Sequence, residues 1–471
     1  MNHLSSGLLL LIGCPPADRA DAPPSLALTH VTLIDGRGGP PLSDATIIVR
    51  SGRISTVGAS SRVSVPSGAR VLDLRNHFVT PGFIDMHYHV TTGAMRYRRT
   101  PAGALDSTYD RALAERLLRV ALSRGITTTR DPGASPLSAA VALRGDVARG
   151  GVLGPRIFTA GPILSSPRLT EPEIRSAIRD QAAAGVDFIK LYARITPSQL
   201  RIAVDEAHRH GLKVIGHLQR TSWTEAAQDG IDFIAHAGNW HETYIPESHR
   251  ADYAALGRGM RARIAWLEWL QLGAPAVDSM VSALAQRGVS VDPTLVAYHT
   301  KFWWRDSIYQ KDPDTALVPE VLANWRVLGM PTGDWTAQEF DRVQAVWPKQ
   351  LGLIRRLHQG GVLLTVGSDL ASPWVIPGVA FHQELELLES AGVSRGDVLR
   401  MATRNGAQAL GIAGDVGTVE VGKRADLVVL EADPLAKLAN TRRIRHVVLG
   451  GIAYTPADLL KGSASSQRKD R

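Results

Sequence analysis

Short runs of apolar residues broken by turn residues occupy both ends of the chain. Residues 28–34, 45–49, 54–57 and 70–74 are of this kind, with turns at Asp35-Gly36 and Ser51-Gly52. The same pattern returns at 417–419, 426–430 and 444–449. We therefore predict that residues 25–76 and 411–458 form two parts of one small β-sandwich.

The long middle of the chain alternates apolar strands with amphipathic helical stretches. Typical helical runs are Glu173–Ala184 and Pro197–His210. Eight strands alternating with helices indicate an α/β fold, a parallel (β/α)8 TIM barrel, over residues 77–410. Segments 238–287 and 296–345 are too long for minimal loops, and we interpret them as insertions over the barrel mouth. The strands are expected at 78–86, 126–130, 156–160, 187–192, 213–217, 232–236, 289–295 and 362–368.

The first residues form a segment of signal-peptide type. An apolar run at 8–12 precedes Gly13-Cys14, and Leu11-Ile12-Gly13-Cys14 resembles a bacterial lipobox. We expect export to the bacterial periplasm or cell envelope, with residues 1–14 as signal peptide and Cys14 as lipid anchor. A cleaved signal peptide without lipid is the alternative. Residues 15–24 would be a tether and 459–471 a polar tail.

The composition of the chain limits the kinds of binding partner that we expect. The net charge is +8, but the basic residues form no tract, so nucleic acid is not an expected partner. Membrane contact is expected only through the N-terminal lipid, and a homo-oligomer remains open. The single cysteine excludes an intramolecular disulfide. A small-molecule substrate is the expected partner.

Polar residues able to bind a metal close several of the expected barrel strands. His87 and His89 end the first, and residues two apart on a strand face the same side. Active sites of such barrels lie at the carboxyl ends of the strands. One His-x-His pair is a weak signal, but the whole set predicts a metal site at the barrel mouth. Its members are His87, His89, Lys190, His217, His236 and Asp369.

These motifs resemble the binuclear-metal type of the amidohydrolase superfamily. The resemblance rests on Pro81–His89, Lys190, His217, His236 and Ser368-Asp369, and on a closing signature at 402–407, 410–411, 417–423 and 425–427. Gly406 departs from the signature, where proline is common. Within the superfamily the chain looks closest to imidazolonepropionase-like and Xaa-Pro-dipeptidase-like members, the group that includes ochratoxinase.

The resemblance implies two divalent metal ions, with zinc suited to this ligand set. His87, His89 and Asp369 would hold one ion, and His217 and His236 the other. A lysine ammonium cannot bind a cation, but a neutral lysine can add CO₂. Lys190, the first lysine of the chain, would bridge the ions as a carbamate. A hydroxide between the metals would attack the carbonyl carbon, and Asp369 would carry its proton to the leaving amine.

Other side chains are candidates for substrate contacts. Tyr192 shares the inward face of Lys190 and would hydrogen-bond an oxyanion or a carboxylate, or simply pack in the barrel. Arg168, Arg194 and Arg220 fall in expected loops at the mouth and would grip a carboxylate, although most loop arginines are merely solvated. All ten tryptophans lie between Trp223 and Trp374, which suggests a preference for bulky apolar substrates or merely packing of the insertions.

The resulting hypothesis is a metal-dependent hydrolase of an amide or peptide-type C–N bond, a dipeptidase or an N-acyl-amino-acid amidohydrolase. A cyclic-amide hydrolase or deaminase of the same superfamily is the alternative, although mononuclear deaminases have no need of a carbamate lysine. A ligand-binding lipoprotein without catalysis is the third reading. It is disfavoured because no metal ligand is missing.

Overall fold

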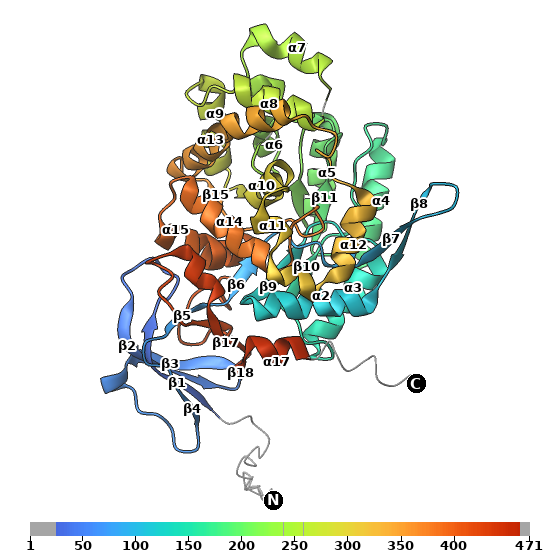
Figure 1. The fold of residues 1–471 in the computed structure, drawn as a ribbon. Helices are drawn as coiled ribbons and strands as arrows, with labels where there is room; N and C mark the ends of the chain where they lie inside the picture. Colours follow the sequence, from blue (N-terminus) through green and yellow to red (C-terminus); the bar gives the residue numbers. More distant parts are fainter. Residues whose placement is uncertain (1–24, 239, 258, 462–471) are drawn as a thin grey trace, which may run out of the picture.

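Strands from both ends of the chain form one mixed sheet in the computed structural model, which describes residues 25–238, 240–257 and 259–461. The strand order is β18-β17-β16-β5-β1-β2-β3, with β4 paired to β1. Apolar side chains of these strands, among them Leu28, Ile47 and Val429, pack into a core of their own. In Figure 1 the blue N-terminal strands and the red C-terminal strands lie together at one end of the molecule. The prediction that both termini build one β domain is confirmed. The strands are β1 (Leu26–Leu33), β2 (Leu42–Arg50), β3 (Arg53–Ala59), β4 (Arg70–Asp73), β5 (Phe78–Pro81), β16 (Leu427–Leu430), β17 (Ile444–Leu449) and β18 (Ile452–Tyr454).

Eight parallel strands follow one another around the barrel. They pair as two sheets, β6-β9-β10 and β11-β12-β13-β14-β15. Parallel bridges between Ala160 and Phe188 and between Tyr88 and Leu370 join the two sheets on both sides. The barrel strands are β6 (Phe83–Asp85), β9 (Ile126–Asp131), β10 (Arg156–Thr159), β11 (Phe188–Leu191), β12 (Lys213–Gly216), β13 (Phe233–Ala235), β14 (Ser290–Asp292) and β15 (Leu363–Leu364).

A helix follows each barrel strand, because apolar residues recur there at helical spacing. In α5, for example, Leu200, Ala203, Val204 and Ala207 are buried, and Thr196 and Gln199 form a capping box at its start. The barrel helices are α2 (Arg111–Ser123), α3 (Leu137–Ala148), α4 (Glu171–Ala183), α5 (Pro197–Arg209), α6 (Trp223–Gln228), α9 (Pro275–Gln286), α13 (Ala337–Gln359) and α14 (Val379–Ser390).

The remaining elements lie in the loops and at the C-terminal end of the chain. The two predicted insertions contain α7 (Arg250–Ala255), α8 (Met260–Trp269), α10 (Leu295–Trp303), α11 (Ser307–Gln310) and α12 (Pro319–Leu328). The barrel helix α9 and the first turns of α13 also fall within the predicted insertion ranges, which were therefore too wide. Elsewhere are α1 (Val90–Gly93), the hairpin β7 (Met95–Arg99) and β8 (Leu105–Tyr109), α15 (Arg395–Arg400), a π-helical turn (Met401–Asn405), α16 (Gly406–Leu410) and α17 (Pro456–Lys461). Short 3₁₀ turns cover Ser60–Arg62, Glu242–Tyr244, Glu247–His249, Pro313–Leu317 and Leu438–Arg442.

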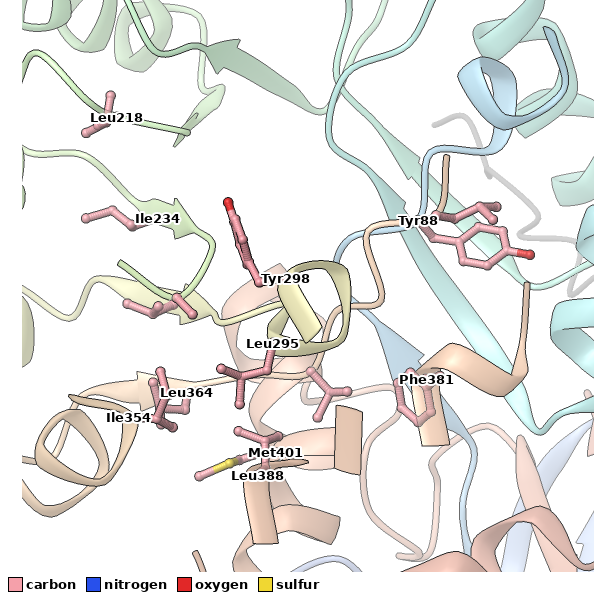
Figure 2. Packing of buried hydrophobic residues seen from close by; sticks show 14 of the residues in the cluster. Tyr88, Leu218, Ile234, Leu295, Tyr298, Ile354, Leu364, Phe381, Leu388 and Met401 are labelled. Carbon is pink, nitrogen blue, oxygen red and sulfur yellow. The ribbon is translucent and has the colours of Figure 1, made fainter. Parts of the chain in front are cut away.

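Helix α10 has two different sides. Figure 2 shows Leu295 directed toward Leu364, Leu388 and Met401 in the apolar core, whereas Tyr298 is directed away from them. The helix therefore anchors in the core through one side and presents the other side to the barrel mouth.

Two features of the ends differ from the sequence prediction. The predicted tail from 459 begins inside α17, where buried Leu459 packs with Leu122 of α2. The predicted signal peptide, Cys14 and the tether lie outside the described residues. No helix among the described residues is long and apolar enough to cross a membrane.

The predicted single strand over 78–86 is in fact two strands with different partners. Phe78–Pro81 pairs with β16 and β1 in the terminal sheet, whereas Phe83–Asp85 pairs with β9 in the barrel. Gly82 lies at the junction, where its N–H donates to the Asp426 carbonyl at 2.8 Å. A Cβ on Gly82 would lie only 2.1 Å from Oγ1 of buried Thr127, so the chain passes here only without a side chain.

We therefore expect Gly82→Ala to destabilise the protein by about 1–3 kcal/mol, because overpacking forces neighbouring atoms to move. Urea denaturation of the full chain measures this change. Gly39→Ala is the matched control, since a Cβ there meets nothing within 4 Å, and it should change stability by less than about 0.5 kcal/mol. Equal stability of Gly82→Ala and the parent would show that the junction is not tightly packed.

Candidate metal centre

The carboxyl ends of the barrel strands surround a cavity of about 420 Å³. All six side chains predicted to bind metal line it, together with Tyr192. They come from strands or strand ends far apart in sequence, which the parallel barrel brings to one mouth. The six are His87 and His89 after β6, Lys190 on β11, His217 after β12, His236 after β13 and Asp369 after β15.

One group of three can hold an ion as it stands. Oδ1 of Asp369 lies 3.4 Å from Nε2 of His87 and 3.7 Å from Nε2 of His89. The ligand atoms offered by these three residues all lie within 4.8 Å of one another. This arrangement gives two imidazole nitrogens and one carboxylate oxygen aimed at a common point.

A second group lies beside the first. The ring centroids of His217 and His236 are 4.3 Å apart, and those of His87 and His236 are 4.9 Å apart. Burial is the main cause that holds the pKa values of His87, His217 and His236 well below the ordinary value. The three rings are therefore neutral at physiological pH, the state in which imidazole binds a metal.

Lys190 and His217 are buried polar groups without partners. Nζ of Lys190 and both ring nitrogens of His217 have no hydrogen-bond partner in the part of the chain that the structure describes. Leaving such groups unpaired in the interior costs free energy, so a ligand is expected to complete them. Burial lowers the pKa of Lys190 to about 8, which increases the share of neutral amine near neutral pH compared with an exposed lysine. The residues present thus fit a centre of divalent ions, and imidazole with carboxylate suits first-row metals.

A buried ion pair that the sequence analysis missed orients the first group. Nδ1 of His87 donates to Oδ2 of Asp292 at 2.6 Å, which turns Nε2 toward Asp369. Nη2 of Arg130 donates to Oδ1 of the same carboxylate at 2.6 Å, and Nε of Arg130 donates to the Met86 carbonyl at 2.7 Å. Asp292 ends β14, so its place at a strand end is the signal that could have found it.

Three residues that follow barrel strands have unusual backbone conformations. His236 and Asp369 have φ of 78° and 59°, and Thr294 has φ of 47°. These left-handed conformations are costly for residues with a Cβ and often mark functional sites. Oγ1 of Thr294 lies 2.7 Å from Nδ1 of His236, so that ring is held through the nitrogen opposite Nε2.

Asp85 connects the first and last barrel strands beneath the ligands. Its Oδ1 accepts hydrogen bonds from the N–H groups of His87 and Ser368, each at 3.0 Å. Its Oδ2 accepts from the Ser368 hydroxyl at 2.7 Å. Burial raises the pKa of Asp85 to about 7. The pair His87 and Asp369 is therefore fixed relative to each other through one carboxyl group.

Of the residues predicted to contact the substrate, only Tyr192 lines the cavity. The Tyr192 ring lies 4.3 Å from the His217 ring and lines the cavity. Arg168, Arg194 and Arg220 are exposed, and none of them lines it. Besides Lys190, the lysine and arginine side chains that line it are Arg263 on α8 and Lys301 on α10.

The tryptophans stand back from the metal centre. No tryptophan of the described residues is among the side chains that line the cavity, and Trp240 packs behind Tyr298 at 5.0 Å between ring centroids. Apolar lining comes instead from Ile163, Met260 and Pro373. Most insertion tryptophans pack against other aromatic rings, as Trp303 does against His299.

A second cavity of about 530 Å³ is lined by residues of α10, α11 and α14, among them His299, Tyr309 and Gln383. No residue that ends a barrel strand lines it. It brings together no metal-binding set among the described residues. The chemistry of the fold is therefore assigned to the strand-end cavity.

The chain is similar in sequence and in fold to known proteins. The chain is 23% identical over 418 residues to an imidazolonepropionase from Maricaulis maris, covering 87% of this chain and 92% of the relative. A match of 44% identity to a dihydroorotase from Anaeromyxobacter dehalogenans is confined to 57 residues, which are 12% of this chain and 13% of that protein. A solved structure from Bifidobacterium longum, provisionally assigned as a prolidase, superposes with a TM-score of 0.66 at 26% identity, covering 93% of this chain and 99% of the other.

The description "Amidohydrolase family" belongs to the family model that matches residues 78–453, which span the barrel and the returning strands of the terminal sheet. Members of this family are hydrolytic enzymes that act on C–N bonds and generally depend on metal. The chain therefore belongs to the amidohydrolase family.

Proposed function

We propose that this enzyme hydrolyses an amide or peptide-type C–N bond with two divalent ions, as a dipeptidase or N-acyl-amino-acid amidohydrolase. The observation that carries the proposal is the convergence of six metal-competent side chains on one cavity, two of which have buried donor atoms without partners. A barrel used only to bind a ligand would not need neutral imidazoles and an unpaired amine at the same point.

The two sets of side chains divide the ions between them. His87, His89 and Asp369 would hold one ion, and His217 and His236 the other. The neutral Nζ of Lys190 can attack CO₂, which forms an N–C bond, releases one proton and leaves an anionic carbamate with two oxygens for the pair. When bound, such ions supply Lewis acidity, which lowers the pKa of water and polarises a carbonyl oxygen.

Asp369 is the candidate for proton transfer. Its Oδ2 accepts a hydrogen bond from the Ser372 hydroxyl at 2.8 Å, whereas its Oδ1 faces His87 and His89. This leaves the carboxylate fixed in orientation at the edge of the cavity. It can take a proton from water and give it to the nitrogen of the leaving group, so that the departing amine is neutral.

Tyr192 is the candidate for a contact with the substrate carbonyl group. Its ring packs beside His217, and the side chain lines the cavity, so its hydroxyl is the candidate donor to the substrate carbonyl oxygen. Met260, Pro331 and Pro373 line the same space and reduce the room for water around the reacting bond.

The proposal predicts hydrolysis of dipeptides or N-acyl amino acids by zinc-loaded enzyme. A library of both classes, with cyclic amides as a third arm, identifies the preferred class by release of free amine. A chelator should abolish turnover, and added zinc should restore it, because the histidines alone cannot activate water. Turnover of cyclic amides only would replace the proposal with the cyclic-amide alternative, and turnover that survives complete metal removal would refute it.

Lys190→Ala should lower kcat/KM by about 100-fold or more and reduce the bound metal, since it removes the shared anionic ligand. Short carboxylates such as acetate should restore part of both, because they can occupy the space left by the carbamate. Metal content by mass spectrometry and hydrolysis of the preferred substrate measure the two effects.

Lys213→Ala is the matched control for that variant. Lys213 begins the neighbouring strand β12 at the opposite end of the barrel, where Nζ donates to the Ala409 carbonyl. It should keep the full metal content. A Lys190→Ala enzyme with two ions and unchanged turnover in the absence of added carboxylate would end the carbamate proposal.

Asp292→Asn should weaken metal binding by about 10–100-fold. The neutral amide has only one acceptor oxygen, so it cannot accept hydrogen bonds from both His87 and Arg130 as the carboxylate does. Zinc affinity by competition with a chromogenic chelator measures the change. Asp312→Asn serves as control, because half-buried Asp312 lines the second cavity and not the strand-end cavity. Unchanged zinc affinity in Asp292→Asn would mean that the buried carboxylate does not orient His87.

A further inference from the structure

Two cationic side chains stand beside the metal centre without an acidic partner. The guanidinium carbon of Arg263 lies 5.0 Å from the Tyr298 ring centroid, and Nζ of Lys301 lies 5.1 Å from the same centroid. Both line the cavity, and Lys301 is 9% exposed. Across the described residues, no ion pair includes either of them. Two like charges so close to one ring in a largely buried site repel each other and favour a bound anion.

Arg263 is held by aromatic faces rather than by carboxylates. Its guanidinium lies 4.1 Å from the Trp240 ring centroid as well as beside Tyr298, whose hydroxyl is also hydrogen-bonded to it. Nε of Arg263 is buried and has no hydrogen-bond partner in the described residues. Stacking covers the faces of the planar group and leaves N–H groups on its edge for an acceptor.

Lys301 is fixed on the other side of the same space. Its Nζ donates to the Ala297 carbonyl at 2.5 Å and lies 3.4 Å from Oγ of Ser372, the residue that also hydrogen-bonds Asp369. Tyr298, which separates the two cations, lies 5.9 Å from His236 between ring centroids. The cationic pair is therefore directly next to the proposed reacting centre, on the side of His236 and Asp369.

We propose that Arg263 and Lys301 bind a carboxylate of the substrate, so that the substrate is an acylated amino acid or a dipeptide with its carboxylate free. This inference rests on the proposed function and names its substrate class. A carboxylate satisfies the free edge of the guanidinium with two parallel hydrogen bonds and neutralises part of the repulsion between the cations. The exposed arginines at 168, 194 and 220 are not needed for this recognition.

The test compares the binding of N-methanesulfonyl-L-leucine and N-methanesulfonyl-L-leucinamide to zinc-loaded enzyme by calorimetry. The two compounds differ in the charge of one group, and a sulfonamide replaces the scissile amide, so that neither is hydrolysed there. The carboxylate should bind at least about 10-fold more tightly than the amide. Arg263→Gln and Lys301→Met should each weaken binding of the carboxylate by about 10–100-fold and change binding of the amide by less than about twofold. Arg263→Lys should lie between the parent and Arg263→Gln, because it keeps the charge and loses the fork.

Arg305→Gln is the matched control. Arg305 also stacks on aromatic rings, 4.6 Å from the Phe340 centroid and 5.3 Å from the Trp304 centroid, but does not line the cavity. It should leave both affinities unchanged, and thermal unfolding midpoints should show that each variant is folded.

Several results would overturn this inference. Equal binding of the two compounds, or no binding of the carboxylate, shows that the cations do not select charge. A preference for the carboxylate that persists in both Arg263→Gln and Lys301→Met shows that the metals bind it instead. Because affinity is measured without turnover, these results are separate from those of the hydrolysis screen. Loss of hydrolysis with the carboxylate preference intact would overturn the proposed function and leave this site standing.

Discussion

The carboxylate of Asp292 is the group on which the geometry of the cavity depends. It has no exposed surface, and it accepts from the fully buried guanidinium of Arg130 and from the ring of His87. Removing either donor would leave a charge in the interior without its partner, which is far more costly than loss of an exposed ion pair. The chain therefore keeps three strand ends, those of β6, β9 and β14, in one relation to each other.

The Asp292 carboxylate also determines which ring nitrogen of His87 is free to bind a metal. Because Nδ1 of His87 donates to Asp292, the lone pair of Nε2 is directed toward Asp369. Thr294 has the equivalent position behind His236, where its hydroxyl lies 2.7 Å from Nδ1. The His87 tautomer with a free Nε2 lone pair is therefore set by Asp292 before any ion arrives.

Most of the fold could be predicted from the periodicity of the sequence, because strands that alternate with amphipathic helices are compatible with few topologies. The position of His87, His89 and the other ligands followed from the rule that strand ends meet at the mouth. The split of 78–86 into two strands did not follow, because one apolar run looks the same whether its partner is the barrel or the terminal sheet. Only Gly82, with Thr127 pressed against it, marks the junction.

The cations of the cavity were also beyond the reach of sequence reasoning. Arg168, Arg194 and Arg220 were candidates for substrate contacts because they fall in expected loops at the mouth, yet none of them lines the cavity. Arg263 lies in the middle of α8, far from any strand end in sequence. Its place is set by how an insertion folds back over the barrel and by stacking on Trp240, neither of which has a local pattern. Sequence reasoning also could not show that Arg130 pairs with Asp292, which lies 162 residues away.

Helix α10 links the support of a metal ligand to two side chains that line the cavity. It begins directly after Thr294, which positions His236, and its first turn is held by buried Glu384, whose Oε2 accepts from the N–H of Val296 at 2.7 Å. One helical turn later the same helix carries Tyr298 and Lys301 into the cavity. A shift of α10 would therefore move a metal ligand's support and the cationic pair together. The core contacts of Leu295 resist such a shift, because close-packed interiors do not deform gradually. Barrel enzymes vary substrate through their loops while strand ends keep the chemistry. Here α10 both adjoins the support of a metal ligand and carries Lys301 of the proposed carboxylate site. The distance between the reacting bond and that site is therefore fixed by a rigid helix. Substrates with a different spacing between scissile bond and carboxylate should be excluded.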